Sequence, residues 1–257
     1  ILGGIGLMTL INLRFYYFWR RDPRRRGRLT MQTRLSVLSA VALLLGGGIM
    51  AWAFEFHHTL KDATLGEQLS WSFFHSTMTR TAGFNVVDVG QMNPPTLLCT
   101  LGLMFIGGAP GSMAGGIKTV TFVVLLLTAW AAFRRRDEIQ FWNRRLPPKV
   151  SFVATMIALF GVACVVLGVG LLMLFEDGRP AAQTHQHWLG LVFEAVSAFG
   201  TVGLSTGVTP LLTGGGKIVI IALMFTGRIA PLVLAVYLAR PASALLVRHP
   251  REELALG

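Results

Sequence analysis

The sequence predicts an all-α membrane protein built from repeated units, each made of a spanning helix, a re-entrant pore helix and a second spanning helix. Three observations predict this class: long apolar runs, basic residues confined to alternate loops, and a pattern that recurs after 120 residues. Of the 257 residues, 53% are apolar and 14% are charged. Soluble domains usually carry about 25% charged residues, so the composition excludes an ordinary soluble domain.

Three apolar runs, at residues 35–54, 150–175 and 218–239, are long enough to cross a bilayer. A hydrocarbon core of about 30 Å needs about 20 helical residues. The runs at 69–78 and 188–199 are shorter, and each lies between a spanning run and a Gly-containing polar tract. Non-helical backbone at membrane depth needs a polar partner or a wet cavity, so these two runs are predicted to be re-entrant half helices.

Lys and Arg concentrate in residues 14–34 and 134–149 and in the tail after residue 239, which together hold 17 of the 23 basic residues. Basic short loops face the cytoplasm, so these three segments are predicted inside and the acidic loops 55–68 and 176–187 outside. The net charge of +11 does not point to nucleic acid, because the basic residues lie between apolar runs. We favour contact with anionic membrane lipid over a dedicated protein-docking role for them.

An internal repeat divides the chain. A shift of 120 residues aligns Thr81 and Gly83 with Thr201 and Gly203. We therefore expect residues 1–29 to end a preceding repeat and its cytoplasmic loop, 30–149 to form a complete pore repeat, and 150–257 to form the final repeat and a C-terminal tail. Because the opening Ile1-Leu2-Gly3-Gly4 matches residues 105–108, we expect the chain to begin inside a repeat.

The two repeated glycine tracts are candidate ion-binding sites. The carboxyl end of a helix carries partial negative charge, and an extended tract after it can aim successive carbonyl oxygens at a dehydrated cation. The alternative is that the glycines only allow close helix packing. The predicted filter residues are Thr81, Ala82, Gly83 and Phe84 in one tract, and Thr201, Val202, Gly203 and Leu204 in the other.

These motifs carry a family resemblance. Residues 79–85, 105–119 and 197–205 closely resemble the Ktr/Trk/HKT superfamily of potassium transporters, and the Pro110 form of the Gly-rich loop and the ending at residues 251–257 look most like Ktr-type membrane subunits. The resemblance implies four pore repeats around one pathway, of which this sequence matches the C-terminal half. It also implies a multi-pass protein of the bacterial inner membrane, a homodimer, and a cytoplasmic ring of nucleotide-binding regulatory subunits.

Residues 107–118 interrupt the second spanning helix of the complete repeat, between apolar segments 96–106 and 119–133. Proline and clustered glycine weaken a helix, so a loop is expected at mid-membrane. By resemblance it is an intramembrane gate loop, although a helix kink without gating is an alternative. A phosphate-binding loop is disfavoured because Ile117 interrupts its motif. The gate residues are Gly107, Gly108, Pro110, Gly111, Ser112, Gly115, Gly116 and Lys118.

Arg228 lies in the middle of an apolar run, at the repeat position of Gly108. An arginine at the bilayer centre costs roughly 2.5 to 3.5 kcal/mol on insertion scales, so an intramembrane charge indicates a functional site. By resemblance it lies beside the pore and opposes cation passage; the alternatives are a structural ion pair or a snorkelling side chain. Glu194 is expected either to bind backbone amides or to make the local field negative, and His75 to be a packed neutral histidine.

The predicted function is therefore potassium transport through a channel-like pore with a selectivity filter, and not an enzymatic reaction. No cofactor is expected beyond K⁺ as the transported ion, with Na⁺ as a candidate activator. Asp88 is expected in the outer vestibule, where it would concentrate cations. Two alternatives remain open: an alternating-access cation symporter built on repeats, and a non-transporting assembly or sensor subunit.

Overall fold

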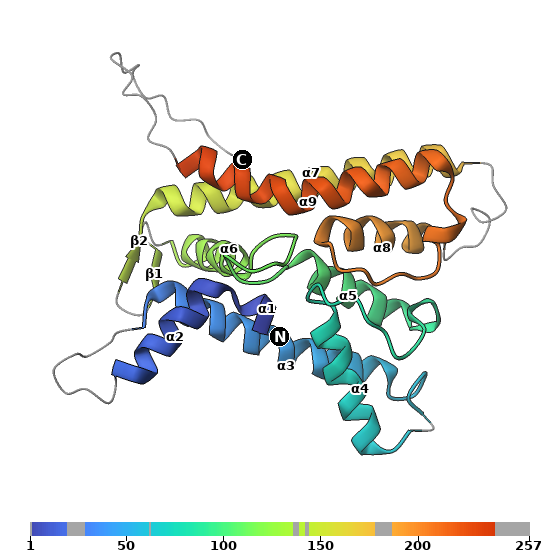
Figure 1. The fold of residues 1–257 in the computed structure, drawn as a ribbon, viewed down its shortest axis with the longest axis horizontal. Helices are drawn as coiled ribbons and strands as arrows, with labels where there is room; N and C mark the ends of the chain where they lie inside the picture. Colours follow the sequence, from blue (N-terminus) through green and yellow to red (C-terminus); the bar gives the residue numbers. More distant parts are fainter. Residues whose placement is uncertain are drawn as a thin grey trace, which may run out of the picture.

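The computed structural model describes residues 2–19, 29–61, 63–135, 139–141, 144–177 and 187–239. Within these ranges the chain is helical except for one short hairpin and the connecting loops, which confirms the predicted all-α class. In Figure 1, α7 (Pro148–Glu176) and α9 (Gly214–Ala239) lie side by side along one edge, α8 (His187–Gly200) lies next to them, and α3 (Met31–Glu55) with α4 (Leu65–Met78) forms the opposite edge.

Within the described ranges, three helices are long and apolar enough to cross a membrane: α3, α7 and the segment Gly214–Pro231 of α9. The helices α3 and α7 contain the runs predicted at 35–54 and 150–175, and the segment of α9 overlaps the first part of the run predicted at 218–239. The predicted division before residue 30 falls just before α3, where the Thr30 hydroxyl accepts a hydrogen bond from the Thr33 amide at 3.2 Å and caps the helix. The predicted division at residues 149 and 150 falls inside the first turn of α7.

The half helices α4 and α8 each contain 14 residues, which corresponds to about 21 Å at 1.5 Å per residue. Neither can cross a core of about 30 Å. A capping box starts α4: the Thr64 amide donates to the Glu67 carboxylate at 2.8 Å, and the Glu67 amide donates to the Thr64 hydroxyl at 3.5 Å. Two helices of equal length thus enter the molecule and stop within it.

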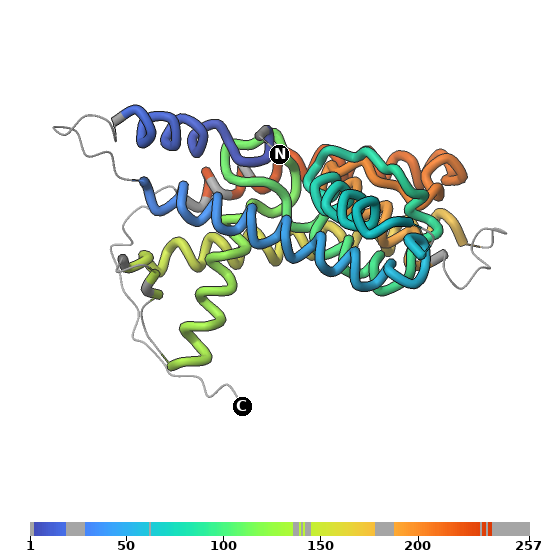
Figure 2. Tube along the Cα trace, turned by 90° about the horizontal axis from the view of Figure 1, so that it is seen from below, coloured from blue at the N-terminus to red at the C-terminus, as the bar shows by residue number. Residues whose placement is uncertain are grey.

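The helices α5 (Pro94–Phe105) and α6 (Thr119–Phe133) flank the predicted interruption, and α6 has the predicted bounds. They do not share an axis: α6 is seen end-on in Figure 1 and runs away from the rest of the molecule in Figure 2. The intervening residues 106–118 therefore reverse and redirect the chain instead of bridging one straight helix. The short helices α1 (Leu2–Ile5) and α2 (Leu7–Trp19) lie beside α3.

A hairpin of β1 (Ile139–Phe141) and β2 (Arg144–Leu146) was not predicted. The strands pair antiparallel with Gln140 opposite Arg145. Strands of three residues in a strongly basic segment carry too little alternation to be detected in a sequence. Two 3₁₀ turns, η1 (Val89–Gln91) and η3 (Thr209–Leu211), occupy equivalent places in the two repeats, just before α5 and α9.

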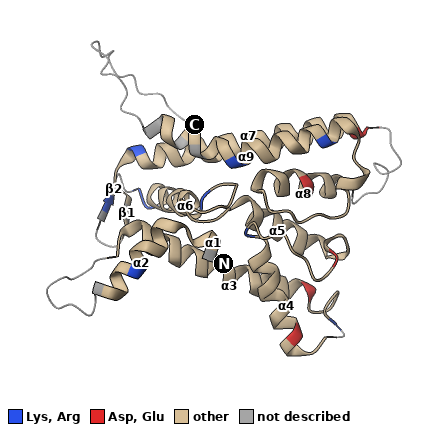
Figure 3. Ribbon diagram, in the orientation of Figure 1, with Lys and Arg blue, Asp and Glu red and all other residues tan. Residues whose placement is uncertain are grey.

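Charged side chains separate along the long axis of the molecule (Figure 3). The described acidic residues gather at the end where α4 and α8 begin, and most basic residues lie at the end that holds α2 and the hairpin. This separation agrees with the orientation predicted from the loops. Many of the arginines that carried that prediction, including Arg24–Arg26 and the tail after residue 239, lie outside the described residues.

The main hydrophobic core forms where α3, α4, α5 and α8 meet. Met104 and Phe193 are fully buried at its centre, and Val202 and Leu204 of the second tract belong to the same cluster. A second cluster joins α7, α8 and α9 around Leu172. Because α8 contributes residues to both clusters, this half helix is packed on two sides. The tract that follows it is therefore held in a fixed position.

Candidate ion pathway

The two glycine tracts adopt the same unusual backbone conformation. Thr81 has φ 64° and Thr201 φ 50°, and the glycines two residues later, Gly83 and Gly203, have φ 72° and 92°. Threonine rarely adopts the left-handed region, because its branched Cβ crowds the backbone, so each tract carries local strain. A residue with negative φ lies between each pair. Alternation of handedness over successive residues turns their carbonyl groups toward a common side.

The tracts lie against each other although 120 residues separate them. A Cβ added to Gly83 would lie 3.2 Å from the Gly203 Cα and would collide with the Val202 carbonyl oxygen. A Cβ added to Gly203 would lie 3.5 Å from the Gly83 Cα. Only glycine at position 83 permits this approach, so the structure brings the two predicted filter tracts to one place.

The surroundings of the two tracts differ. Val202 and Leu204 are buried in the main core, and the Leu204 carbonyl accepts a hydrogen bond from the Ser197 hydroxyl at 2.6 Å. Ala82 is exposed, and Phe84 is 70% exposed. The second tract is thus supported from behind by its own chain, whereas the described residues leave the side chains of Ala82 and Phe84 uncovered.

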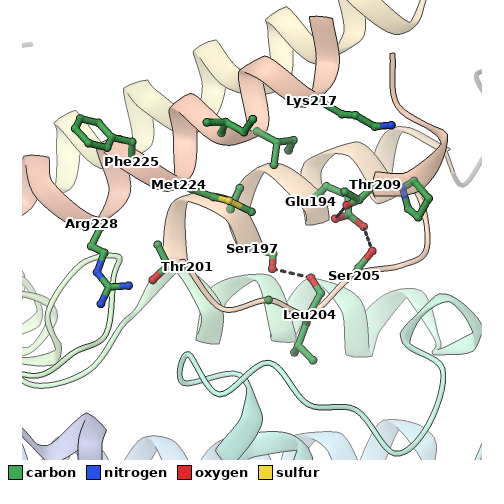
Figure 4. A pocket seen from close by; sticks show the side chains of 15 residues that line it. Glu194, Ser197, Thr201, Leu204, Ser205, Thr209, Lys217, Met224, Phe225 and Arg228 are labelled. Carbon is green, nitrogen blue, oxygen red and sulfur yellow. Dashed lines mark hydrogen bonds between the residues drawn. The ribbon is translucent and has the colours of Figure 1, made fainter. Parts of the chain in front are cut away.

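Glu194 on α8 fixes the chain that follows the second tract (Figure 4). Its Oε1 accepts hydrogen bonds from the Ser205 hydroxyl at 2.6 Å, the Thr206 amide at 2.9 Å and the Thr206 hydroxyl at 3.2 Å, and its Oε2 accepts one from the Thr209 hydroxyl. The carboxylate thus binds one backbone amide, as the first of the two expected roles requires, together with three hydroxyl groups. The Glu194 side chain is 4% exposed and lies beside a cavity of about 840 Å³ between α8 and α9.

The predicted gate loop folds as a closed turn. Residues 106 and 117 form an isolated parallel bridge, in which the Gly107 amide donates to the Ile117 carbonyl at 2.7 Å and the Ile117 amide to the Phe105 carbonyl at 3.1 Å. Gly111 and Gly116 have φ 75° and 65°. The neck of the loop is therefore tied by backbone bonds, and glycine supplies the two left-handed positions that the turn requires.

The loop lies directly against the second tract. The Gly115 amide donates to the Thr201 hydroxyl at 3.1 Å, and a Cβ on Gly115 would come within 2.8 Å of the Gly200 carbonyl oxygen. A Cβ on Gly108 would lie 2.7 Å from the Ser112 hydroxyl and 2.8 Å from the Gly4 carbonyl oxygen. Small residues thus let the loop fit between α1 and the end of α8.

Two cations border this loop. The Lys118 ammonium donates to the Ala114 carbonyl at 2.6 Å, and Arg228 projects from α9 toward the loop and Thr201 (Figure 4). Lys118 and Arg228 are near enough to repel each other electrostatically. Among the described residues no carboxylate forms an ion pair with Arg228, so the structure does not support the alternative of a structural ion pair. Arg228 also lines the cavity that holds Glu194.

The other candidate residues take structural positions. His75 is buried, with its Nε2 3.0 Å from the Thr100 hydroxyl and its ring stacked on Trp71, as expected of a packed histidine. Asp88 caps η1 by accepting a hydrogen bond from the Gly90 amide at 3.0 Å. Within the described ranges no three His, Cys, Asp or Glu side chains group as a metal site would require.

Glu55 and Glu176 correct a sequence-based expectation. Both were counted among acidic residues of outward-facing loops, but they are 0% and 4% exposed. Glu55 accepts hydrogen bonds from the Asn93 amide at 2.9 Å and the Thr96 hydroxyl at 2.5 Å, and Glu176 accepts two from Thr213, both at 2.8 Å. Glu55 thus ends α3 and binds the start of α5, and Glu176 ends α7 and binds the start of α9.

Comparison with known proteins gives one consistent result. Residues 11–245 match the family model TrkH, described as cation transport protein. The chain is 34% identical over 260 residues to the Ktr system potassium uptake protein B of Vibrio alginolyticus, which covers 100% of this chain and 54% of that protein. The Ktr system potassium uptake protein D of Bacillus subtilis is 33% identical over 260 residues, covering 100% and 55%.

Among solved structures, the crystal structure of the potassium transporter TrkH from Vibrio parahaemolyticus matches with a TM-score of 0.62 and 18% identity. The match covers 93% of this chain and 50% of that one, and at this identity it supports the fold. The chain spans about half the length of the curated relatives that it matches.

Proposed function

The chain belongs to the TrkH family of cation transport proteins, and we propose that it forms two walls of a potassium-conducting pathway. In this proposal the backbone carbonyls of residues 81–84 and 201–204 coordinate dehydrated K⁺. The choice of K⁺ rests on the names of the relatives, which are potassium uptake proteins of other organisms. The chain is a multi-pass membrane protein, and three helices among its described residues are able to span.

The observation that carries the proposal is the shared conformation and contact of the two tracts. Each follows a half helix of 14 residues, each pairs a left-handed threonine with a left-handed glycine, and the two glycines meet. Helix carboxyl ends carry partial negative charge, and carbonyls on one axis can replace the water around a cation. Close packing alone would need the glycines but not the strained threonines.

The loop at residues 106–118 and Arg228 are proposed to control passage on the inner side of the tracts. The loop contacts Thr201, the first residue of the second tract, so its displacement would change the space beneath that tract. Arg228 and Lys118 place positive charge beside the same region. A permeating cation would meet a barrier there that depends on the position of the loop.

Three further properties are proposals by family likeness. We propose that the protein works as a homodimer, with a cytoplasmic ring of nucleotide-binding regulatory subunits, and that Na⁺ acts as an activator. An alternating-access symporter is the competing mechanism. Direct repeats with paired tracts favour a channel-like pore over it, because many such transporters have inverted repeats. A non-transporting subunit would need no strained tract.

The test is potassium uptake by cells that lack their own uptake systems. The protein, expressed in its native assembly, should restore growth at low K⁺, and Gly203→Ser should reduce the preference for K⁺ over Na⁺, because a Cβ at φ 92° strains the tract. Failure of the wild-type assembly to restore uptake would reject transport. Unchanged selectivity in Gly203→Ser would reject the placement of the filter, and absence of single-channel currents despite uptake would favour alternating access.

A further inference from the structure

A proline inside α9 leaves one backbone carbonyl of that helix without its usual partner. Pro231 is buried within the continuous helix Gly214–Ala239. Proline has no amide hydrogen, and its ring crowds the carbonyl four residues earlier, which here belongs to Gly227. The Gly227 carbonyl therefore cannot form its intrahelical bond and needs another donor, since it lies in a buried part of the helix.

That donor comes from the intramembrane loop. The Gly116 amide donates to the Gly227 carbonyl at 3.2 Å, and the preceding amide, of Gly115, donates to the Thr201 hydroxyl at 3.1 Å. Two successive amides of the loop thus bind two different elements, α9 and the second tract. The left-handed conformation of Gly116, with φ 65°, turns the chain after these two amides, toward Ile117, whose amide donates to the Phe105 carbonyl.

Gly227 is also the point where α9 meets the end of α8. A Cβ on Gly227 would come within 2.8 Å of the Phe199 Cα and would collide with the Phe199 carbonyl group. The contact fixes the Gly227 backbone relative to the second tract, which begins two residues after Phe199. The acceptor for Gly116 is therefore held rigidly beside that tract.

We propose that Pro231 is a positioning residue, which frees the Gly227 carbonyl to act as a latch for the loop at residues 106–118. While the bond from Gly116 is made, the loop stays beneath the second tract. When the loop moves, the carbonyl has no competing donor in its own helix, so the latch is available to close again. The consequence for ion flow rests on the proposed function, whereas the latch itself does not.

The opposite side of the loop has separate attachments. The Ala109 amide donates to the Gly4 carbonyl at 2.8 Å, and the Leu7 amide donates to the Gly111 carbonyl at 3.2 Å. These bonds do not involve α9 and stay in place when residue 231 changes. Loss of the latch should therefore loosen the part of the loop near Gly116 and leave the part near Gly4 attached.

The test uses two variants in the native assembly. Pro231→Ala restores an amide that can bond the Gly227 carbonyl within the helix and compete with Gly116. The matched control, Ala230→Pro combined with Pro231→Ala, keeps one proline in the helix but frees the Thr226 carbonyl, about 100° around the helix axis from that of Gly227. Hydrogen exchange of residues 106–118 reports the latch, and potassium uptake reports its consequence.

We expect Pro231→Ala to exchange the amides near Gly116 about fivefold faster, the effect of losing one typical hydrogen bond, and to raise uptake. The double variant should behave like Pro231→Ala. Unchanged exchange in Pro231→Ala, or wild-type exchange in the double variant, would overturn the latch, because the second result would assign the effect to the helix kink. Faster exchange in Pro231→Ala, together with a wild-type assembly that takes up no potassium, would support the latch and reject the proposed function.

Discussion

Replacement of Glu194 tests how the second tract is held in place. The carboxylate is 4% exposed and joins α8 to residues 205–209 through four hydrogen bonds, three to Oε1 and one to Oε2. One donor is the Thr206 amide, and the others are hydroxyl groups. Glu194→Ala removes the acceptor of all four, so the chain directly after Leu204 loses its attachment to the half helix.

The cost can be bounded from these contacts. A hydrogen bond to a charged group contributes about 1.5 to 3 kcal/mol, and an unpaired buried donor costs about 1 to 3 kcal/mol. Water can enter the adjacent cavity of about 840 Å³ and satisfy the rotatable hydroxyls. The fixed Thr206 amide depends most on the carboxylate, so we expect Glu194→Ala to destabilise the protein by about 2 to 4 kcal/mol, and Glu194→Gln by about half as much because it keeps one acceptor oxygen.

The assay combines thermal unfolding of the purified protein with the ratio of K⁺ to Na⁺ uptake. Both Glu194 variants should unfold at lower temperature and lose selectivity, with Ala more affected than Gln. Glu67→Gln is the matched control, because this exposed carboxylate only caps α4 and glutamine serves in the same capping box. Wild-type unfolding and selectivity in Glu194→Ala would refute the reasoning that this carboxylate holds the tract.

Three other experiments test separate parts of the structure. Gly83→Ala should abolish selective uptake, because its Cβ collides with the facing tract at φ 72°, whereas Gly66→Ala, which meets nothing within 4 Å, should be neutral. Arg228→Gln should change potassium conductance or apparent affinity several-fold, with Arg228→Lys intermediate, and indistinguishable uptake curves at matched expression would show a structural role. Glu176→Gln and Thr213→Val should couple by about 1 kcal/mol in a double-mutant cycle of unfolding, and additive effects would contradict their bond.

The sequence allowed the helical layout to be predicted because the bilayer limits the possibilities. A span requires about 20 apolar residues, and glycine or proline clusters mark where a helix stops, so the bounds of α6 and the half-length of α4 and α8 followed from composition. The repeat then related Gly83 to Gly203 without any coordinates. Which carbonyls face an ion remains a prediction for both tracts.

The polar contacts could not be predicted in the same way. Glu55 and Glu176 each follow a long apolar run. Their separation along the chain nearly equals the repeat length, which was a signal that they share a role. Their partners, Asn93 and Thr213, lie 38 and 37 residues later along the chain. A carboxylate at a helix end is equally compatible with solvent and with a buried bond, and only the packing of the second helix decides between them.

The two repeats have diverged in complementary ways at one position. The helix of the first breaks after Phe105, and its Gly107 and Gly108 enter the loop, whereas in the last repeat the equivalent Gly227 and Arg228 continue within α9. The loop that follows the broken helix has free amides, and Pro231 in the unbroken helix leaves the Gly227 carbonyl free. The hydrogen bond from the Gly116 amide to the Gly227 carbonyl therefore satisfies both repeats. A change in either helix therefore acts on the same loop. Control of passage would belong to the junction of the repeats and to neither repeat alone.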